Sequence, residues 1–233
     1  MQDSKELEFS IVATPIGNLE DITYRAVKTL KEADFILCED TRKTKVLLDR
    51  YEISKPLKAY HQQTNDSKIE RILEQMSEVK KVALVTDAGT PGISDPGNIL
   101  IKKALEFFGD KIKITPIPGA NALSALLSVA GINTTRFTFM GFPPNKKGRE
   151  KFFREVLVSD YPVIYYESPY RLMKNLELIE GLQEELEVSK KLVLGRELTK
   201  MFEEIKRGEV ADIKKYYEEN SDKIKGEVVV LVY

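Results

Sequence analysis

The sequence predicts an α/β protein built from two α/β domains. Two observations predict this class: short apolar runs of strand length alternate with amphipathic helical patterns, as in βαβ units, and one proline-marked connection interrupts the pattern near the middle of the chain. The connection, Pro116-Ile117-Pro118-Gly119, divides the chain into residues 1–117 and 118–233. From the alternation we expect mostly parallel sheets covered by helices.

The first domain opens with its clearest unit. Residues 9–13 read as a buried strand, a Thr-Pro-Ile-Gly-Asn loop follows, and Asp21 can cap a helix with an apolar face that includes Leu30. Further strands are expected at residues 35–38, 82–85 and 112–114, with helices after Glu39 and over residues 66–79.

The second domain is expected to begin with a helix over residues 120–130, whose small side chains allow close packing against a sheet. Apolar runs predict four strands, at residues 137–140, 163–166, 192–194 and 228–232. Helical patterns separate them at residues 151–158, 172–182 and 210–217.

Composition excludes several classes of function. Of the 233 residues 42% are hydrophobic, which is enough for real cores, and 36 basic against 37 acidic residues exclude a polybasic protein. One cysteine, Cys38, and one histidine, His61, cannot build a zinc site, an iron–sulfur cluster or a disulfide, so we expect no metal centre. The polar start, residues 1–6, lacks the segments of a signal peptide, and no apolar run is long enough to cross a bilayer. We expect a soluble cytoplasmic protein.

Three loops rich in glycine and proline follow predicted strands, at residues 14–18, 86–97 and 118–122. Ligands of open α/β sheets bind at the carboxyl ends of strands, so these loops are candidates for a binding site. The first loop lacks the further glycines of a dinucleotide fingerprint and the Lys-Ser/Thr pair of a P-loop, which disfavours a phosphate cradle. Asp87, in the second loop, can accept hydrogen bonds from amino or hydroxyl groups. Each loop alone is more typical of a plain strand-to-helix turn, but three such loops at one edge of a sheet weaken that interpretation.

At these loops the chain resembles the tetrapyrrole methylase superfamily of S-adenosylmethionine-dependent enzymes. Within the superfamily, five motifs resemble a branch that methylates ribosomal RNA. They are Val12-Ala-Thr-Pro-Ile-Gly-Asn-Leu-Glu-Asp-Ile-Thr23, Glu39-Asp-Thr-Arg42, Asp87-Ala-Gly-Thr-Pro91, Tyr166-Glu-Ser-Pro-Tyr-Arg171 and Arg196-Glu-Leu-Thr-Lys200. Many members of this branch carry a further C-terminal segment after the final strand, whereas this chain ends at Tyr233.

The resemblance implies two α/β domains with S-adenosyl-L-methionine bound in a cleft between them. It implies 2′-O-methylation of a cytidine ribose in the decoding region of 16S ribosomal RNA, within the small ribosomal subunit, and a homodimer. By resemblance, Asp87 and Thr90 lie at the methionine side of the cofactor, with Pro15 and Gly17 in the same cleft. The remaining cofactor positions that it implies are Asn121, Ala122, Tyr165 and Leu198.

In the expected reaction, the group that needs activation is the nucleophile. Methyl transfer from a sulfonium releases a neutral thioether and needs no acid, but a ribose hydroxyl gains roughly 10²- to 10⁴-fold from a positioned base. The candidates for acid–base or positioning roles are Lys200, Glu167, Glu39 and Asp40. Lys200 acts as a base only if burial or nearby cations, such as Arg196 and Arg171, lower its pKa; a phosphate contact is the alternative.

Binding to RNA requires local positive charge. Five basic residues against the single acid Glu150 lie between positions 146 and 154: Lys146, Lys147, Arg149, Lys151 and Arg154. Arg42 and Lys43 form a second cluster with Lys45, and Arg171 belongs to a motif of the RNA-methylating branch. Such runs are also typical of solvated helix faces, and that interpretation stays open.

Three other functions compete with RNA methylation. Methylation of a porphyrin-like small molecule would use the same fold and cofactor, but those relatives favour a glycine-richer first loop and are not expected to carry Glu39-Asp-Thr-Arg42. Methylation of a protein, as in diphthamide synthesis, is a weaker alternative for the same reason. A catalytically silent ribosome-binding protein would bind the cofactor without turnover.

Overall fold

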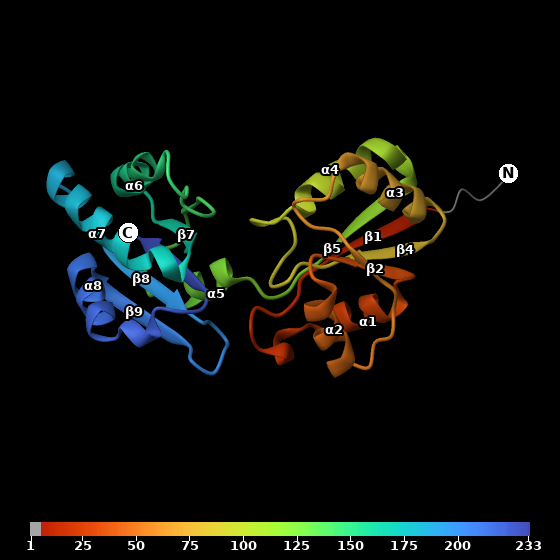
Figure 1. Ribbon diagram of the computed structural model, residues 1–233, viewed down its shortest axis with the longest axis horizontal. Coiled ribbons are helices and arrows are strands. Elements are labelled where there is room, and N and C mark those ends of the chain that lie inside the picture. Colours follow the sequence, from red (N-terminus) through yellow and green to blue (C-terminus); the bar gives the residue numbers. More distant parts are fainter. Residues whose placement is uncertain (1–5) are drawn as a thin grey trace. The chain divides into compact units, whose positions relative to one another are not determined.

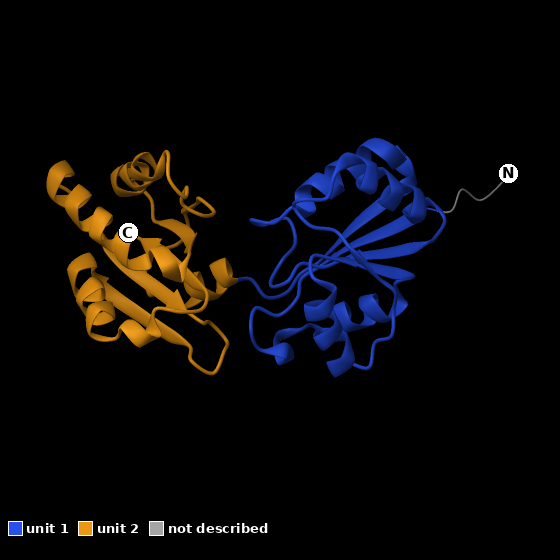
Figure 2. Cartoon of the chain, in the orientation of Figure 1, with its two compact units in different colours: residues 1–121 blue, residues 122–233 orange. Residues whose placement is uncertain are grey.

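The computed structural model describes residues 6–233, so most of the polar start that argues against a signal peptide lies outside the described residues. The chain forms two compact units, residues 1–121 and 122–233 (Figure 2). The division falls after Asn121, slightly later than the boundary at residue 117 that the prolines indicate.

Unit 1 contains a five-stranded parallel sheet in the order β3-β2-β4-β1-β5. Its strands are β1 (Leu7–Val12), β2 (Phe35–Cys38), β3 (Leu57–Ala59), β4 (Lys81–Leu84) and β5 (Ile112–Ile117). Its helices are α1 (Tyr24–Glu32), α2 (Thr41–Arg50), α3 (Asp66–Ser77) and α4 (Gly97–Phe108), with short 3-10 turns at Leu19–Asp21 and Gly109–Lys111.

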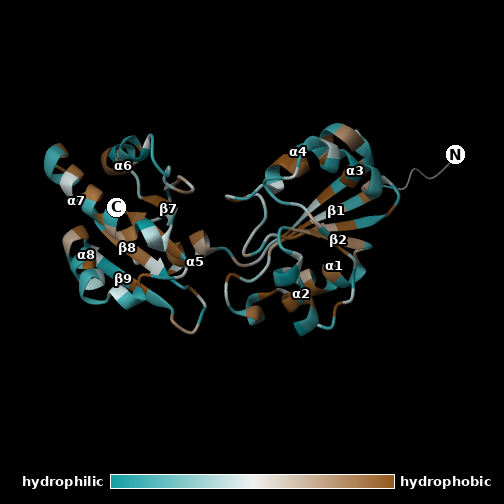
Figure 3. Ribbon diagram, viewed as in Figure 1, coloured by the Kyte–Doolittle hydropathy of each residue, from teal (hydrophilic) through white to brown (hydrophobic). Residues whose placement is uncertain are grey.

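Two hydrophobic cores lie on the two faces of this sheet. Helices α1 and α2 cover one face and α3 and α4 cover the other (Figure 1). Each helix presents an apolar stripe to the strands and a polar side to water, so hydrophobic and hydrophilic residues alternate along the ribbons in Figure 3. This double covering explains why β2 and the last three residues of β4 are continuous apolar runs.

Helix starts in unit 1 follow side-chain caps. The hydroxyl of Thr23 accepts a hydrogen bond from the Ala26 amide at 3.0 Å, so α1 begins at Tyr24 and not beside Asp21 as predicted. Asp40 caps α2 by accepting from the Arg42 amide at 2.9 Å. The sequence pattern does not predict helix α4, because this helix begins directly after Pro96 inside what reads as a long loop.

Unit 2 contains a second five-stranded sheet in the order β6-β7-β10-β8-β9. Its strands are β6 (Thr138–Phe139), β7 (Val163–Glu167), β8 (Lys191–Arg196), β9 (Glu204–Glu209) and β10 (Val228–Val232). Its helices are α5 (Ala122–Val129), α6 (Arg149–Val158), α7 (Pro169–Leu186) and α8 (Val210–Glu219), with a 3-10 turn at Ser221–Lys223. Helices α6, α7 and α8 pack on one face, while α5 contacts β8 and β10.

The expectation of mostly parallel sheets is wrong for unit 2. Only β6 and β7 are parallel; β10 runs antiparallel to both β7 and β8, and β9 runs antiparallel to β8. Strand β9 escapes prediction because its Glu-Ile-Lys-Arg-Gly-Glu sequence is charged, as edge strands often are. One consequence matters for function: β7 and β8 run in the same direction, so their carboxyl ends lie at the same edge of the sheet.

Candidate functional site

The loops after β1 and β4 meet at the point in the unit 1 sheet where the connections from neighbouring strands run to opposite faces. Strands β1 and β4 are neighbours, but the chain leaves β1 towards α1 on one face and β4 towards α4 on the other, which is where open α/β sheets bind ligands. Thr14 and Gly89 form an antiparallel bridge there, with N···O distances of 2.8 and 3.1 Å. The Thr14 hydroxyl also donates to the Thr86 carbonyl at 3.2 Å.

The third loop is joined to the same edge. The Thr90 hydroxyl donates to the carbonyl oxygen of Ala120 at 3.2 Å. A Cβ at Gly119 would lie only 3.0 Å from the Cβ of Ala13, and Gly89 adopts a φ of +83°, so both glycines allow main chains to run close together. The structure therefore brings the three predicted loops of unit 1 together. Pro15 is buried within the first loop, and Gly17 is exposed.

Acidic residues after β2 connect to the loop after β4. The Thr86 hydroxyl donates to Oε1 of Glu39, and the Asp40 amide donates to Oδ1 of Asp87 at 3.0 Å. Lys43 donates to Oδ2 of Asp87 at 2.7 Å, so the second basic cluster supplies an internal partner for this carboxylate.

Asp40 is a helix cap and not a free base. Besides capping α2, its two carboxylate oxygens accept from Nε and Nη2 of Arg42 at 3.0 and 2.7 Å. These hydrogen bonds hold the pKa of Asp40 well below its usual range. The Arg42 side chain is otherwise exposed.

In unit 2 the candidate residues lie at the shared carboxyl edge of β7 and β8. Val228, at the start of β10, is paired with Glu167 on one side and Arg196 on the other. Because strands are spaced by about 4.8 Å, the ends of β7 and β8 are roughly 10 Å apart. Glu167 and the loop that carries Lys200 therefore belong to one edge of the second sheet.

Glu167 is enclosed within unit 2. Its oxygens accept from Nδ2 of Asn175 at 2.6 Å and from the Ser168 amide at 2.7 Å, and Nε of Arg171 lies 4.0 Å away. Burial raises the pKa of Glu167 above its usual value, although these hydrogen bonds oppose the shift. Its carboxylate supports its neighbours and offers almost no surface to a substrate.

The structure corrects the expected surroundings of Lys200. Its ammonium group contacts two carboxylates, Glu197 at 2.7 Å and Glu227 at 3.1 Å, in place of the cations that we expected to lower its pKa. Burial disfavours the charge, but hydrogen bonds to the two glutamates outweigh it, so the pKa of Lys200 is raised. Glu197 has a φ of +52°, and Gly226 leaves the space that its carboxylate occupies. This arrangement favours the protonated form of Lys200 and does not support a role as a base, and that role stays a prediction.

Tyr165 lies in the hydrophobic core of unit 2. Its ring makes edge contacts with Phe152 and Phe153, with centroids 5.7 and 5.8 Å apart, and the side chain has no face for a ligand. The side chain therefore does not support a cofactor contact, and the assignment of Tyr165 to the cofactor stays a prediction. Leu198 is buried after β8, where it packs over Gly195.

Asn121 and Ala122 lie where the two units divide, and Ala122 is the first residue of α5. The assignments of Asn121, Ala122 and Leu198 to the cofactor stay predictions.

The basic residues at positions 146–154 differ in their exposure and in their contacts. Lys146 and Lys147 are exposed in the loop, and Arg149 is half-buried as the first residue of α6. Arg154 pairs with Glu150 and Glu185, so its charge is neutralised.

Arg171 faces the same loop. Its Nη1 donates to the Pro143 carbonyl at 3.1 Å and to Oδ1 of Asn145 at 2.5 Å. Arg171 thus orders the loop that carries the exposed lysines.

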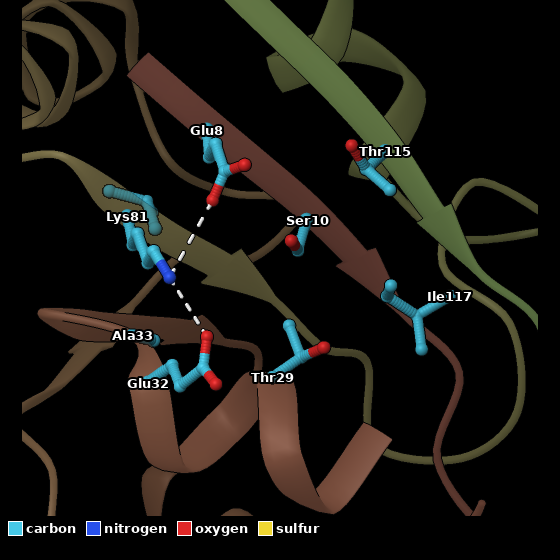
Figure 4. A pocket seen from close by; sticks show the side chains of 9 residues that line it. Glu8, Ser10, Thr29, Glu32, Ala33, Lys81, Thr115 and Ile117 are labelled. Atoms are coloured by element: carbon cyan, nitrogen blue, oxygen red, sulfur yellow. Dashed lines mark hydrogen bonds and ion pairs between the residues drawn. The ribbon is translucent and has the colours of Figure 1, made fainter. Parts of the chain in front are cut away.

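A polar hollow in unit 1 is a weaker candidate (Figure 4). Its lining residues come from α1, the following Ala33, β1, β4 and β5, and the hydroxyls of Ser10 and Thr115 border it. Lys81, the one cation among the lining residues, lies between Glu8 and Glu32 at 3.8 and 2.8 Å. Lys81 is therefore paired with carboxylates and is not an unpaired cation that would attract an anionic ligand.

In the chain from residue 6 onward, no helix is both long and apolar enough to span a membrane.

Comparison with known proteins shows the family to which the chain belongs. Residues 8–214 match the family model of tetrapyrrole (corrin/porphyrin) methylases. Ribosomal RNA small subunit methyltransferase I of Thermotoga maritima is 40% identical over 95% of this chain and 96% of its own length. The chain belongs to the ribosomal RNA small subunit methyltransferase I family. A member of this family from Halalkalibacterium halodurans is 42% identical, and the match covers 95% of this chain and 74% of that protein.

Solved structures show the same fold outside the methyltransferase I family. A diphthine synthase matches 96% of this chain and 88% of its own chain with a TM-score of 0.72 at 16% identity. A cobalt precorrin-4 methyltransferase matches 99% of this chain and 97% of its own with a TM-score of 0.65, also at 16% identity. At such low identity these likenesses establish the tetrapyrrole methylase architecture alone.

Sequence reasoning misses the residues that hold the candidates in place. The partners Glu197 and Glu227 are 30 residues apart in sequence and meet through a backbone amide-to-carboxylate hydrogen bond of 2.8 Å. Thr86 and Asn175 are likewise set by tertiary contacts. The only local signal is Gly226, a glycine beside a charged pair, which indicates a turn but not its partner.

Proposed function

We propose that the protein transfers a methyl group from S-adenosyl-L-methionine to the 2′-oxygen of a cytidine ribose in the decoding region of 16S ribosomal RNA. The observation that carries this proposal is the 40% identity, over 95% of the chain, to a protein named as a ribosomal RNA methyltransferase. The joined loops of unit 1 and the exposed lysines of unit 2 support it. We infer that the enzyme acts in the cytoplasm as a homodimer on the small ribosomal subunit.

The loops at the carboxyl edge of unit 1 suit this cofactor. S-adenosylmethionine supplies an activated methyl group, and its adenosyl and amino acid parts offer many neutral hydrogen-bonding groups. The lack of side chains at Gly89 and Gly119 lets such groups approach the main chain, and Asp87 provides a carboxylate for an amino group. We assign cofactor binding to Asp87 and Thr90 with the neighbouring loop residues Pro15 and Gly17.

Glu39 is the acid–base candidate that remains available for the ribose hydroxyl. Asp40 is held by Arg42, Glu167 is buried, and Lys200 pairs with two carboxylates that favour its protonated form. Oε1 of Glu39 accepts from Thr86, and within the described residues its Oε2 has no hydrogen-bond partner. We assign to Glu39 the acceptance of the hydroxyl proton as the oxygen forms its bond to the methyl carbon.

The exposed basic residues are assigned to contacts with the RNA backbone. Lys146, Lys147 and Arg149 lie together at the start of α6, and Arg42 is exposed on α2. We assign phosphate contacts to these residues. Lys200 pairs with Glu197 and Glu227, so we assign it a role in positioning the loop after β8. Arg171 supports the loop of unit 2, and Lys43 supports Asp87, so both act through other residues.

A methyl-transfer assay tests the proposal. The protein is incubated with methyl-labelled S-adenosylmethionine and unmodified small subunits, naked 16S RNA or a tetrapyrrole precursor. Label in the RNA of small subunits is expected. Label in the tetrapyrrole alone would replace the RNA substrate by a small molecule, and cofactor binding without transfer to any substrate would indicate a silent binding protein.

A further inference from the structure

Two aromatic rings stand exposed beside the basic loop of unit 2. Phe142 is 53% exposed and Tyr170 is 96% exposed. Each directly precedes a residue of the contact between Arg171 and the Pro143 carbonyl, so this contact holds together the two chain segments that carry the rings. Large exposed apolar groups gathered at one place commonly mark a binding surface.

The Phe142 ring is held in a fixed position. Gly141 lies shortly after β6 and has a φ of +64°. Its carbonyl accepts a hydrogen bond from the Tyr166 amide at 2.8 Å. The Phe142 ring rests on Tyr166 with centroids 5.4 Å apart, and Tyr166 rests on Phe139 at 5.0 Å. A ring fixed from behind loses little conformational entropy when a ligand covers its front.

The surroundings of the rings are cationic. The loop over residues 141–148 contains Lys146 and Lys147 and no Asp or Glu, and it leads into α6 (Figure 1). Arg171 pins this loop through Pro143 and Asn145, so rings and lysines belong to one ordered surface. Aromatic faces beside phosphate-binding cations are the arrangement by which proteins hold unpaired nucleic acid.

We propose that Phe142 and Tyr170 are a stacking platform for unpaired bases of the RNA substrate, with Lys146 and Lys147 holding the adjoining phosphates. The inference rests on the proposed function and deepens it, because it predicts that the bases next to the modified ribose are bound unstacked from their neighbours. A paired helix cannot present its base faces to these rings. The partner favoured by the charge is RNA; a protein partner is an outcome of the test.

Binding of short single-stranded oligoribonucleotides, measured by fluorescence anisotropy, tests the platform. Phe142→Ala and Tyr170→Ala are each expected to weaken binding at least about fivefold, while Phe142→Tyr keeps it. Phe142→Leu preserves apolar volume without a ring and should weaken binding like the alanine variant. Phe107→Ala is the matched control, because Phe107 is 52% exposed and also rests on one ring, Phe108, at 4.8 Å, but beside the acid Glu106.

Salt dependence separates stacking from charge. Replacing Lys146 and Lys147 by methionine should reduce the slope of log affinity against log salt by about 0.7 for each phosphate that a lysine no longer neutralises. Removal of the Phe142 ring should lower affinity at every salt concentration and leave the slope unchanged. Thermal unfolding of each variant shows whether its fold is intact. Unchanged oligonucleotide affinity in folded Phe142→Leu and Tyr170→Ala would overturn the platform.

Methyl transfer distinguishes failure of this inference from failure of the proposed function. The ring variants should raise KM for small subunits, with kcat and cofactor affinity unchanged. If the wild type methylates small subunits and both ring variants match it, the platform is wrong and the function stands. If no subunit is methylated but ring-dependent binding of single strands persists, the function is wrong and the platform stands. Dissociation of a dimer by these substitutions without loss of RNA binding would identify a protein interface and overturn the inference.

Discussion

The ammonium nitrogen of Lys200 lies 2.7 Å from Oε1 of Glu197, and the same oxygen accepts from the Glu227 amide at 2.8 Å. One carboxylate oxygen thus joins the end of β8 to the turn before β10 and fixes a cation between them. The arrangement favours the protonated lysine, which suits a structural link between β8 and β10 and not removal of a proton.

Lys200 should therefore not titrate in the working range of the enzyme. Its raised pKa means that its ion pairs are fully present below 10.5, the ordinary value, and are lost only as pH rises through the higher folded value. We expect the ratio of kcat/KM between wild type and Lys200→Arg to stay constant from about pH 6 to 9 in initial-rate measurements. A ratio that climbs with pH would show a neutral lysine acting as the base.

Glu39→Gln tests the proposed proton acceptor. The amide keeps a hydrogen bond to Thr86 but cannot take a proton, so kcat should fall by roughly 10²- to 10⁴-fold. Cofactor affinity, measured by calorimetry, should change less than about twofold. Glu74→Gln, an exposed position on α3, serves as the control and should leave kcat unchanged. Retention of more than about a tenth of kcat in Glu39→Gln would assign the proton to another group.

Asp87→Ala should weaken binding of S-adenosylmethionine. A hydrogen bond to a charged group contributes about 1.5–3 kcal/mol, which corresponds to a roughly 10- to 150-fold weaker affinity in calorimetry. Lys43→Met is the companion variant, because it removes the 2.7 Å partner of Asp87 and leaves the carboxylate in place. Equal effects in the two variants would mean that Asp87 acts by ordering α2 and not by binding the cofactor.

The buried carboxyl of Glu167 predicts a pH-dependent stability. Its raised pKa means that the folded protein binds this proton more tightly than the unfolded chain, so its contribution to the free energy of unfolding falls as pH rises above 4.5. Glu167→Gln lacks this dependence. In urea titrations the stability of the variant relative to wild type should increase from about pH 4 to pH 7. A relative stability that is constant or decreases over this interval would show that Glu167 is ionised as readily when folded as when unfolded.

The unit 1 sheet can be predicted from sequence because its strands are buried on both faces. Apolar runs such as Phe35–Cys38 and residues 82–85 indicate core strands, and the loops between them carry the recognisable motifs. The antiparallel order of unit 2 cannot be predicted in the same way. Its edge strand β9 is charged, and an apolar run such as Val228–Val232 does not show the direction of its neighbours.

At the candidate site, sequence indicates residue types but not their partners. Proximity in sequence predicts that Arg196 lies beside Lys200, but Arg196 is turned inward, with Nη2 bound to the Phe202 carbonyl at 3.1 Å. Tyr165 belongs to an apolar run that the sheet turns towards α6, so its ring is core. Both cases concern side-chain direction, which depends on the pleat of a strand and on contacts distant in sequence.

The chemical nature of the product tests the central claim most directly. Unmodified small subunits are treated with the enzyme and S-adenosylmethionine, and their 16S RNA is digested to nucleosides and analysed by mass spectrometry, with the site mapped by resistance of the adjoining phosphodiester to alkali. The account predicts one equivalent of 2′-O-methylcytidine at a single position in the decoding region. A methyl group on a base, or RNA without any added methyl group, would contradict it.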